Sequence, residues 1–378
     1  MHKFTLMHQN NPVAHISLQK DSVGRGYLHV DNIINTKELP YGLKNEKADR
    51  MSMSMTWWNN TRCIPLGRPN YEKMLSHMGL TNSSELLPYT YMCSLTDCYW
   101  FKPFDSYVAW EDVNFRDNGF SSNLYRYLFY DENNIRINTL NSPDLTTDGA
   151  LPKMWIERDD TFYLVKSSMT RPPIDVYNEI IANEILNQLN LAHTPYFLEE
   201  INGITASVCP CFIQDNTTEF VQAESLILDG YYDSPNNYLN TMRHFGYQNE
   251  IDSMILTDMI IGNIDRHSRN YGQIIDTATQ KVMGAAPIFD NGGCTFLSDV
   301  SQLIYKPTNK TFEETTLMLN NDICARAECI DLQAVFNLVD SFPLSIQNKS
   351  DIKSNLDNRV SHIIELSRGI DHDFDRNL

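Results

Sequence analysis

The sequence predicts an α+β protein with two lobes and a further α/β domain at its amino-terminal end. Short strand-like runs separated by turn residues fill the first third of the chain. A strand–turn–strand pattern follows near residue 160, and most of the chain after residue 219 has apolar residues at helical spacing. These patterns place a mixed sheet in one lobe and mostly helices in the other. A chain of 378 residues is long enough to bury a core in each part.

Residues 1–140 are expected to form the additional α/β domain. Turn signals at 10–12 and 21–26 separate the strand-like runs, whereas 72–78 and 83–87 have helical patterns. Aromatic side chains are frequent in this part, and such a density predicts a buried core. These aromatic residues are Trp57, Trp58, Tyr89, Tyr91, Tyr99, Trp100, Phe101, Phe104, Tyr107 and Trp110.

The domain boundaries are placed in polar segments. Runs at 133–134 and 141–149 have the composition of a linker. We therefore expect an accessory domain over 1–140, a sheet-bearing lobe over 141–220 and a mostly helical lobe over 221–378.

Two polar segments of the helical lobe carry the candidate chemistry. The first is Gly262-Asn-Ile-Asp-Arg-His-Ser-Arg-Asn270. The second contains Asp290, which follows an apolar pair. Phosphoryl transfer requires a carboxylate that accepts the substrate hydroxyl proton, and an amide oxygen and a second carboxylate that hold Mg²⁺ on the phosphates. Asp265, Asn270 and Asp290 supply these groups in the order in which kinase chains carry them, so a kinase-type active site is the first hypothesis.

The surroundings of these segments favour that hypothesis. Apolar residues at helical spacing predict a helix over 249–261 that ends at Gly262. Runs at 271–275 and 281–283 predict a hairpin, and residues 288–289 predict the end of a buried strand. Helix, polar loop, hairpin and then Asp is the order in which a kinase C-lobe presents its catalytic loop and metal-binding Asp.

A structural explanation of the same residues stays open. Asp and Asn are the usual turn-forming residues, and Asp-Asn-Gly-Gly at 290–293 is a good turn by composition alone. Arg266 and His267 have weaker signals than the three polar residues around them. His267 is either a functional residue or one that shapes the loop.

A hairpin is expected over 153–166 in the sheet-bearing lobe. Lys166 ends its second strand, where a lysine usually extends to solvent or caps the strand. Here a helix follows from near Pro173 and carries Glu179 in its second turn. That order suits the Lys–Glu pair that positions the α- and β-phosphates in kinases, and Glu184 is a competing partner for the lysine.

Two further segments of this lobe are candidates for nucleotide contacts. Thr146-Thr-Asp-Gly-Ala-Leu-Pro-Lys153 contains one glycine and lacks the Gly-Lys-Ser/Thr ending of a Walker loop, yet its position suits a loop over the phosphates. A second hairpin is expected around Asn202-Gly203. Its second strand leads to Cys211 and Phe212, whose backbone groups are candidates for contacting adenine.

Composition disfavours several other classes of function. The chain has 30 Lys and Arg against 48 Asp and Glu, a formal net charge of −18, which repels nucleic-acid backbones and anionic membranes. Eight cysteines without paired Cys-x2-Cys units predict reduced thiols in a cytosol. The amino terminus lacks the apolar core of a signal peptide, and no stretch has the ~20 apolar residues of a membrane span. We expect a soluble cytoplasmic protein.

The chain resembles a bacterial HipA-like serine/threonine kinase, which has a bilobal protein-kinase-like fold. The matching segments, in order, are Gly149-Ala150 with Lys153, Leu164-Val-Lys-Ser167, Asn178-Glu179, Val208 to Phe212, Asp265-x4-Asn270, and Asp290. A looser similarity to HipA-domain proteins of Gram-positive anaerobes covers Trp57-Trp58 and residues 110–114.

The resemblance implies phosphorylation of a protein Ser or Thr with ATP and Mg²⁺. Asp265 is then the catalytic base, Asn270 and Asp290 are the metal ligands, and Lys166 is the phosphate-binding lysine. The remaining nucleotide-binding candidates are Gly149, Ala150, Lys153, Glu179, Cys211, Phe212 and His267.

Departures from the family pattern concern regulation. The toxin members carry a regulatory serine three residues before Gly-Ala, and Thr146 stands at that place here. Asn-Gly-Gly follows Asp290, so switching by a Phe after the metal Asp is not expected. The toxin members also bind a DNA-binding antitoxin, and an antitoxin-like partner is an expectation from the resemblance alone.

Two rival functions remain. Phosphoinositide kinases share an Asp-Arg-His-x2-Asn loop, but their activation loop is basic, and residues 291–305 contain no Lys or Arg before Lys306. The second rival is a pseudokinase, a nucleotide-binding module without turnover. It is a minority reading because every candidate catalytic group is present.

Overall fold

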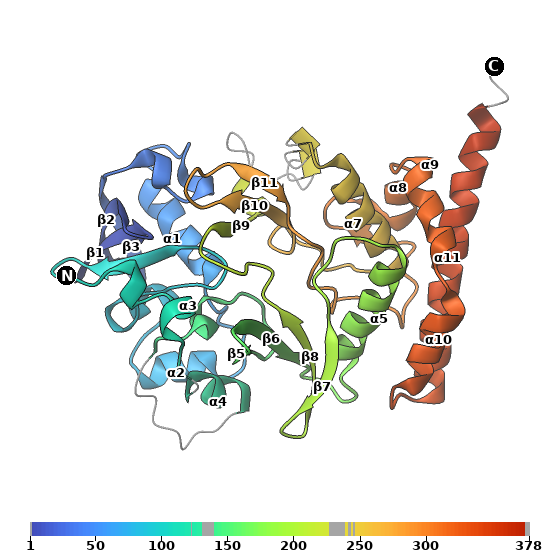
Figure 1. Ribbon diagram of the computed structural model, residues 1–378, viewed down its shortest axis with the longest axis horizontal. Helices are drawn as coiled ribbons and strands as arrows, with labels where there is room; N and C mark the ends of the chain where they lie inside the picture. The colour runs from blue at the N-terminus through green and yellow to red at the C-terminus, as the bar shows by residue number, and fades with distance from the viewer. Residues whose placement is uncertain are drawn as a thin grey trace. The chain divides into compact units, whose positions relative to one another are not determined.

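The computed structural model describes residues 2–121, 123–130, 140–226, 239–240, 243–244 and 246–374 (Figure 1). The chain forms two compact units. Unit 1 comprises Met1–Lys166, Cys211–Val221 and Ile274–Met283. Unit 2 comprises Ser167–Pro210, Gln222–Gln273 and Gly284–Leu378. The polar run at 133–134 lies outside the described residues, and the three-part division at 140 and 220 remains a prediction.

Unit 1 begins with an antiparallel sheet of order β3-β2-β1-β4. Its strands are β1 (His2–His8), β2 (Asn11–Lys20), β3 (Gly26–Ile33) and β4 (Tyr99–Pro103). The helix α1 (Met51–Arg62) packs along β3. Its Ser52 and Thr56 hydroxyls accept the N–H groups of Val30 and Leu28 at 3.0 and 2.9 Å. The helix therefore satisfies donors that an edge strand would otherwise expose.

The remaining helices of this region are short. They are α2 (Tyr71–His77), α3 (Phe115–Asn118) and α4 (Asn123–Tyr130). The helix expected over 83–87 is confirmed as a 3₁₀ helix, Ser83–Tyr89. It contains Pro88, which has no N–H to donate to an α-helical bond.

The aromatic residues of the first third do bury a core. Trp100 and Phe101 have no exposed surface, and Trp58 and Trp110 are also buried. Tyr89, Phe104 and Tyr107 are exposed, so the expectation was wrong for these three side chains. Tyr107 lies in the irregular segment between β4 and the next helical turn, where no element covers it.

The predicted hairpin near residue 160 is confirmed as β5 (Lys153–Arg158) and β6 (Thr161–Ser167). Asp159 and Asp160 both have positive φ, 48° and 59°, as a two-residue hairpin turn of the I′ type requires. A third sheet, of order β11-β10-β9, contains β9 (Thr218–Gln222), β10 (Gly272–Asp276) and β11 (Val282–Ala285). The hairpin predicted from the runs at 271–275 and 281–283 is thus confirmed as β10 and β11. The strand β9 was not expected, because the chain after residue 219 was predicted to be mostly helical.

Unit 2 contains the helix predicted to start near Pro173, α5 (Ile174–Gln188). It also contains the hairpin of β7 (Phe197–Ile201) and β8 (Ile204–Pro210), whose turn residues Asn202 and Gly203 have φ of 51° and 77°. The helix α7 (Gln248–Ile261) ends at Gly262, in the left-handed conformation with φ of 65°. These three predictions are confirmed.

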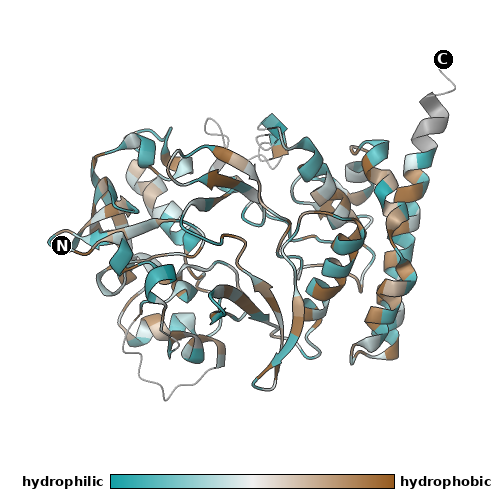
Figure 2. Ribbon diagram, viewed as in Figure 1, coloured by the Kyte–Doolittle hydropathy of each residue, from teal (hydrophilic) through white to brown (hydrophobic). Residues whose placement is uncertain are grey.

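The rest of unit 2 is largely helical. Two short paired strands, β12 (Ile304–Tyr305) and β13 (Lys310–Thr311), precede α8 (Phe312–Thr316), α9 (Asn321–Ala325), α10 (Leu332–Ser341) and α11 (Ile346–Phe374). The long helix α11 runs beside α9 and α10 (Figure 1). Its apolar and polar residues alternate along its length (Figure 2). It buries Ile352, Leu356, Val360 and Ile363, one face of a helix.

Residues 288–289 do not form the expected strand end. Ile288 forms an isolated parallel bridge with His193, in which the Ile288 N–H donates to Ala192 O at 3.0 Å. None of the described helices is long and apolar enough to cross a membrane. All eight cysteines are free thiols, and seven of them are buried.

Candidate active site

The loop that carries Asp265 is shaped by its own polar residues. The Asn263 side chain accepts the Asp265 N–H at 3.0 Å, and the His267 N–H donates to Asp265 O at 2.7 Å. The Asn270 N–H in turn donates to His267 O at 2.8 Å. These bonds reverse the chain tightly between α7 and β10. They leave the Asp265 side chain 55% exposed, so its carboxylate is accessible to a substrate.

Arg266 is the fully buried centre of the site. Its guanidinium donates to both carboxylate oxygens of Asp258 on α7 and to the Asn291 side chain. One of its nitrogens, Nη1, donates both to Asn270 O at 3.0 Å and to Phe289 O at 2.6 Å. Because one nitrogen contacts both carbonyls, the backbone at Asn270 lies next to the backbone that leads into Asp290.

The charge of Arg266 is secured by its partner. Burial acts to lower the pKa of this guanidinium, but the Asp258 carboxylate outweighs burial and raises the pKa above its usual value. Tyr305 also donates its hydroxyl to Asp258 Oδ2 at 2.5 Å. Burial and Asp258 hold the pKa of Tyr305 well above its usual range, so this hydroxyl remains a donor.

The segment around Asp290 is held in an uncommon backbone conformation. Asp290 has a φ of 58°, in the left-handed region that Asp tolerates better than most residues. Its N–H donates to the Tyr196 hydroxyl at 3.1 Å. On α5, Glu179 Oε2 accepts the Asn291 N–H at 2.9 Å, and Asn178 Nδ2 donates to Gly292 O and Cys294 O. These bonds stabilise the strained turn.

The backbone after Asp290 lies close to its neighbours, most closely at Gly293. A Cβ built on Gly293 would lie 2.8 Å from the Cβ of Asp265. A Cβ on Gly292 would meet Asp175 O at 3.3 Å and the Glu179 side chain at 3.5 Å. The Asn-Gly-Gly sequence therefore lets the turn after Asp290 lie against the catalytic loop.

The residues present fit a magnesium ion bound together with a nucleotide. The Asn270 side chain donates weakly to Asp265 O, at 3.5 Å, which turns its amide oxygen the other way. An amide oxygen and one carboxylate, from Asn270 and Asp290, are the hard oxygen ligands that Mg²⁺ accepts beside phosphates and water. Among the described residues, no cluster of three His, Cys, Asp or Glu side chains could hold a metal ion.

The candidate phosphate loop, in unit 1, is anchored by two cations. Buried Arg68 donates from Nε to Gly149 O at 2.8 Å and from Nη2 to Thr147 O and to Asp148 O. Lys153 Nζ donates to Asp148 O at 2.9 Å. Gly149 has a φ of 100°, and a side chain there would collide with Lys153 Nζ. Ala150 follows and is exposed.

Lys153 and Lys166 are direct cross-strand partners in the β5–β6 hairpin. Lys153 is 7% exposed and Lys166 4%. Like charges on directly opposed residues of a hairpin repel one another, so an anion bound beside this pair would stabilise it. The pairing of Lys166 with Glu179 remains a prediction.

The predicted hinge residues lie in unit 1, and the backbone groups of Cys211 already have hydrogen-bond partners. The Cys211 N–H donates to Phe162 O at 2.8 Å, and its carbonyl accepts from the Gln214 side chain. Burial raises the pKa of the Cys211 thiol, which stays neutral. The contact of Cys211 and Phe212 with adenine remains a prediction, and Cys211 N–H would have to exchange its present partner.

Thr146 and His267 each have a structural role in this conformation. The buried Thr146 hydroxyl contacts Cys93 O at 2.7 Å and Pro143 O at 3.3 Å. His267 Nδ1 accepts the Arg269 N–H at 3.3 Å. The structure thus brings Asp265, Asn270, Asp290 and Glu179 together in unit 2. The candidates Thr146, Gly149, Ala150, Lys153, Lys166, Cys211 and Phe212 belong to unit 1.

Several contributors were missed from the sequence. Asn178 was noted only as the neighbour of Glu179, and Asp258 and Tyr305 carried no signal because each is distant in sequence from the loop it supports. Arg266 was given a weaker signal than its neighbours, although it is fully buried and joins the loops of the site. Lys306 was noted only as the first cation after residue 291, and its Nζ lies 2.5 Å from Asp265 Oδ1.

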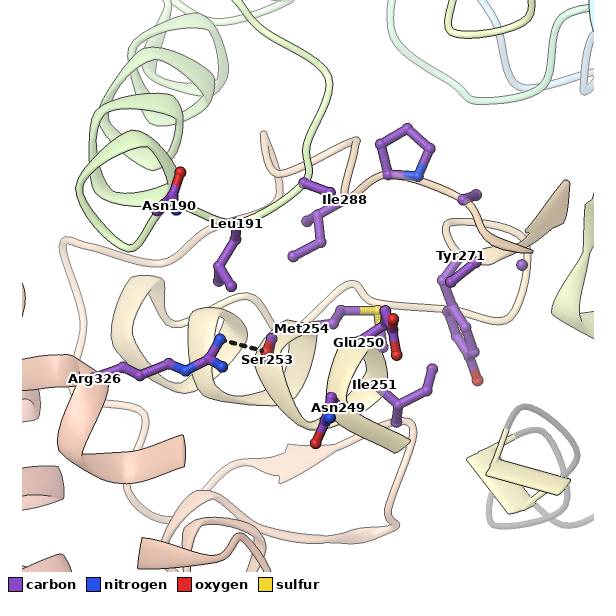
Figure 3. Close-up of a pocket in the computed structure, with 15 residues that line it drawn as sticks. Asn190, Leu191, Asn249, Glu250, Ile251, Ser253, Met254, Tyr271, Ile288 and Arg326 are labelled. Carbon is purple, nitrogen blue, oxygen red and sulfur yellow. Dashed lines mark hydrogen bonds between the residues drawn. The ribbon is translucent and has the colours of Figure 1, made fainter. Parts of the chain in front are cut away.

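A cavity of about 280 Å³ lies within unit 2, beside these loops. Leu191, Met254 and Ile288 point into it, and Arg326 donates to Ser253 at its edge (Figure 3). Its wall includes residues directly after Asn270 and shortly before Asp290, but none of the predicted site residues. We do not assign the nucleotide to it.

Comparisons with known proteins identify relatives in sequence and in fold. No family model matches the chain. The serine/threonine-protein kinase CtkA of Helicobacter pylori (strain J99) is 23% identical over 233 residues, which cover 50% of this chain and 71% of that protein. The crystal structure of the H. pylori proinflammatory kinase CtkA covers 58% of this chain and 95% of its own, with 21% identity and a TM-score of 0.49.

A second solved structure covers nearly the whole chain. It is the Shewanella oneidensis MR-1 toxin–antitoxin complex of HipA, HipB and operator DNA, which matches 96% of both chains with a TM-score of 0.60 and 11% identity. The expected fold class is therefore confirmed. Similarity in sequence to CtkA and in fold to HipA together support a HipA-like protein kinase.

Proposed function

We propose that this chain, which has the fold of a HipA-like kinase, transfers the γ-phosphoryl group of ATP to a Ser or Thr hydroxyl of a protein substrate. The chain itself is one candidate substrate. The observation that carries the proposal is the Arg266 clamp, which holds the loops of Asp265, Asn270 and Asp290 against one another. A turn-forming role for these residues does not explain why a buried arginine joins them.

In the proposed transfer, Asp265 accepts the proton of the substrate hydroxyl. The hydroxyl oxygen forms a bond to the γ-phosphorus, while the bond between that phosphorus and the bridging oxygen breaks and its electron pair leaves with ADP. Asn270 and Asp290 would hold Mg²⁺, which neutralises phosphate charge when bound. Lys153 and Lys166 would bind phosphate oxygens, and Gly149 and Ala150 would lie over them.

Substitutions in the clamped loops test the proposal. Asp265→Ala should keep the melting temperature, because an exposed carboxylate contributes little to the core, but should lower phosphorylation by orders of magnitude. Asn270→Ala and Asp290→Ala should chiefly weaken Mg²⁺-dependent nucleotide binding. Mass spectrometry after incubation with Mg-ATP, alone and with host lysate, would detect the phosphate. Wild-type turnover by the Asp265→Ala protein would exclude the assignment.

The lipid-kinase alternative is disfavoured by charge. Residues 291–305 contain Asp299 and no Lys or Arg, so this segment does not supply cations for an anionic headgroup. The pseudokinase alternative predicts nucleotide binding without turnover. A thermal-shift titration with ATP, with and without Mg²⁺, measures nucleotide binding, and the phosphorylation assay measures turnover. A pseudokinase should bind without turnover, whereas an active kinase should show both.

Regulation and partners are further parts of the proposal. Phosphorylation of Thr146 would require its hydroxyl to leave Cys93 O and Pro143 O, so the loop would have to open first. Phosphopeptide mapping decides this, since a Thr146 phosphate should be absent from the Asp265→Ala protein. An antitoxin-like partner and a cytoplasmic location remain proposals. A net charge of −18 argues against direct nucleic-acid contact by this chain.

A further inference from the structure

Lys306 makes the ion pair with the proposed catalytic base. Its Nζ lies 2.5 Å from Asp265 Oδ1, and both side chains are about half exposed, 54% and 55%. Exposed pairs of this kind contribute little to stability. A structural purpose for the pair is therefore weak, and its position beside Asp265 calls for another explanation.

The backbone that carries Lys306 is tied rigidly to the catalytic loop. Tyr305 has no exposed surface, and its hydroxyl donates to Asp258, the carboxylate that also binds Arg266. The Asn309 N–H donates to Tyr305 O at 2.9 Å, which closes the β12–β13 turn. Lys306 therefore directly follows buried Tyr305, which binds the same Asp258 carboxylate as Arg266 of the catalytic loop.

The other cations near this loop are committed elsewhere. Arg266 is fully buried and bound to Asp258, Asn291 and two carbonyls. Arg269 Nη1 lies 3.7 Å from Glu224 Oε2. Within the part of unit 2 that the structure describes, Lys306 is the cation paired with Asp265.

We propose that Lys306 is a catalytic residue, whose ammonium contacts the transferring phosphoryl group. This inference rests on the proposed function. The hydroxyl that gives its proton to Asp265 must lie within hydrogen-bond reach of that carboxylate, about 2.6–3.2 Å, and the phosphorus within about 3–3.5 Å of the hydroxyl oxygen. An ammonium beside Asp265 therefore lies within a few ångströms of the phosphoryl oxygens.

The proposed contact stabilises charge that appears only during transfer. The substrate oxygen bonds to phosphorus as its proton passes to Asp265, and the bond to ADP breaks with its electron pair. Without substrate Lys306 neutralises Asp265, and during transfer its flexible ammonium binds the equatorial oxygens. A donor used mainly in the transition state should change kcat far more than the KM for ATP.

The decisive experiment measures binding of a transition-state analogue, which needs no known substrate. Wild-type protein, Lys306→Met and Lys310→Met are titrated with Mg-ADP in the presence and absence of aluminium fluoride, by calorimetry. Lys310 is an exposed lysine on the same β12–β13 pair and serves as the matched control. Initial rates of ADP formation give kcat and KM for the same proteins.

We expect fluoroaluminate to tighten Mg-ADP binding in the wild type and in Lys310→Met. In Lys306→Met, the gain in affinity from fluoroaluminate should be about 10²-fold or more smaller, and kcat should fall by a similar factor. The affinity for Mg-ADP alone should be unchanged. A full fluoroaluminate gain in Lys306→Met would overturn the inference, as would an equal loss in Lys310→Met or a loss confined to Mg-ADP affinity. If the wild type bound no Mg-nucleotide, the proposed function itself would fail, and this inference with it.

Discussion

Of the two glycines after Asp290, Gly293 should be the one whose substitution by alanine lowers activity, although it is the more exposed of the two. Gly293 is exposed and Gly292 is buried, so a simple burial argument predicts that Gly292→Ala is the harmful change. The contacts predict the reverse. The new Cβ in Gly293→Ala would lie 2.8 Å from Asp265 Cβ, whereas carbons pack at about 3.5–4.0 Å. Asp265 would have to move by about 0.7–1.2 Å.

A displacement of about 1 Å at a reacting group costs on the order of 10²-fold in rate, about 2.7 kcal/mol at 1.36 kcal/mol per tenfold. Gly293→Ala should therefore lower kcat by about 30- to 100-fold. Its stability should change little, because Asp265 is exposed and can move, and because alanine reduces the entropy of the unfolded chain by about 0.4–1 kcal/mol.

Gly292→Ala is the matched control. Its Cβ meets Asp175 O at 3.3 Å and Glu179 at 3.5 Å, contacts that need a shift of only a few tenths of an ångström. Neither glycine has a positive φ, so alanine is not strained at either position. We expect kcat within about threefold of the wild type, a limit that corresponds to about 0.65 kcal/mol.

The assay is the initial rate of ADP formation at saturating Mg-ATP, with the melting temperature of each variant measured in parallel. Wild-type kcat in Gly293→Ala would refute the reasoning, and so would a larger loss in Gly292→Ala than in Gly293→Ala. Either result would mean that the turn after Asp290 does not constrain the position of Asp265.

Further substitutions test the supports of the site. Arg266→Met should destabilise unit 2 by about 3–5 kcal/mol in urea unfolding, because it leaves the buried Asp258 carboxylate without its cation; an unchanged midpoint would contradict this. Arg68→Gln should raise the KM for ATP more than it lowers kcat, because it releases three carbonyls of the phosphate loop; an unchanged KM would argue against that loop. Burial acts to lower the pKa of His8, but hydrogen bonds and charge from Glu219 and Glu38 raise it above its usual 6.5. The charged imidazole therefore stabilises the fold fully below about pH 6.5, and this is lost as pH rises through the folded-state pKa. Urea midpoints should fall above pH 6.5 in the wild type relative to His8→Gln, and parallel pH curves would refute the assignment.

Local patterns were sufficient for many elements of the fold. The Asn202-Gly203 turn, the Asp159-Asp160 turn and the end of α7 at Gly262 each depend on residues that adopt positive φ with little strain. Their signals lie within a few positions of one another along the chain. The same holds for Asp265 and Asn270, which lie on one short loop, and for Asp290, which follows soon after in the chain. Their order could therefore be predicted from the sequence.

The prediction of 288–289 as a strand end failed because an apolar run predicts burial but does not say which backbone groups will be partners. Ile288 forms one isolated bridge, to His193, and no strand. The helical pattern over 83–87 is confirmed, although it did not predict the 3₁₀ type of the helix that contains Pro88.

The sequence by itself determined which polar groups carry the candidate chemistry and in what order they occur. Only the tertiary structure decided how those groups are held, because the supports are far apart in the chain. Arg266 meets Phe289 and Asn291, Tyr305 meets Asp258, and Lys306 meets Asp265. A charge can be buried without a large cost only when a specific partner is placed beside it, and that placement depends on packing that no local pattern encodes.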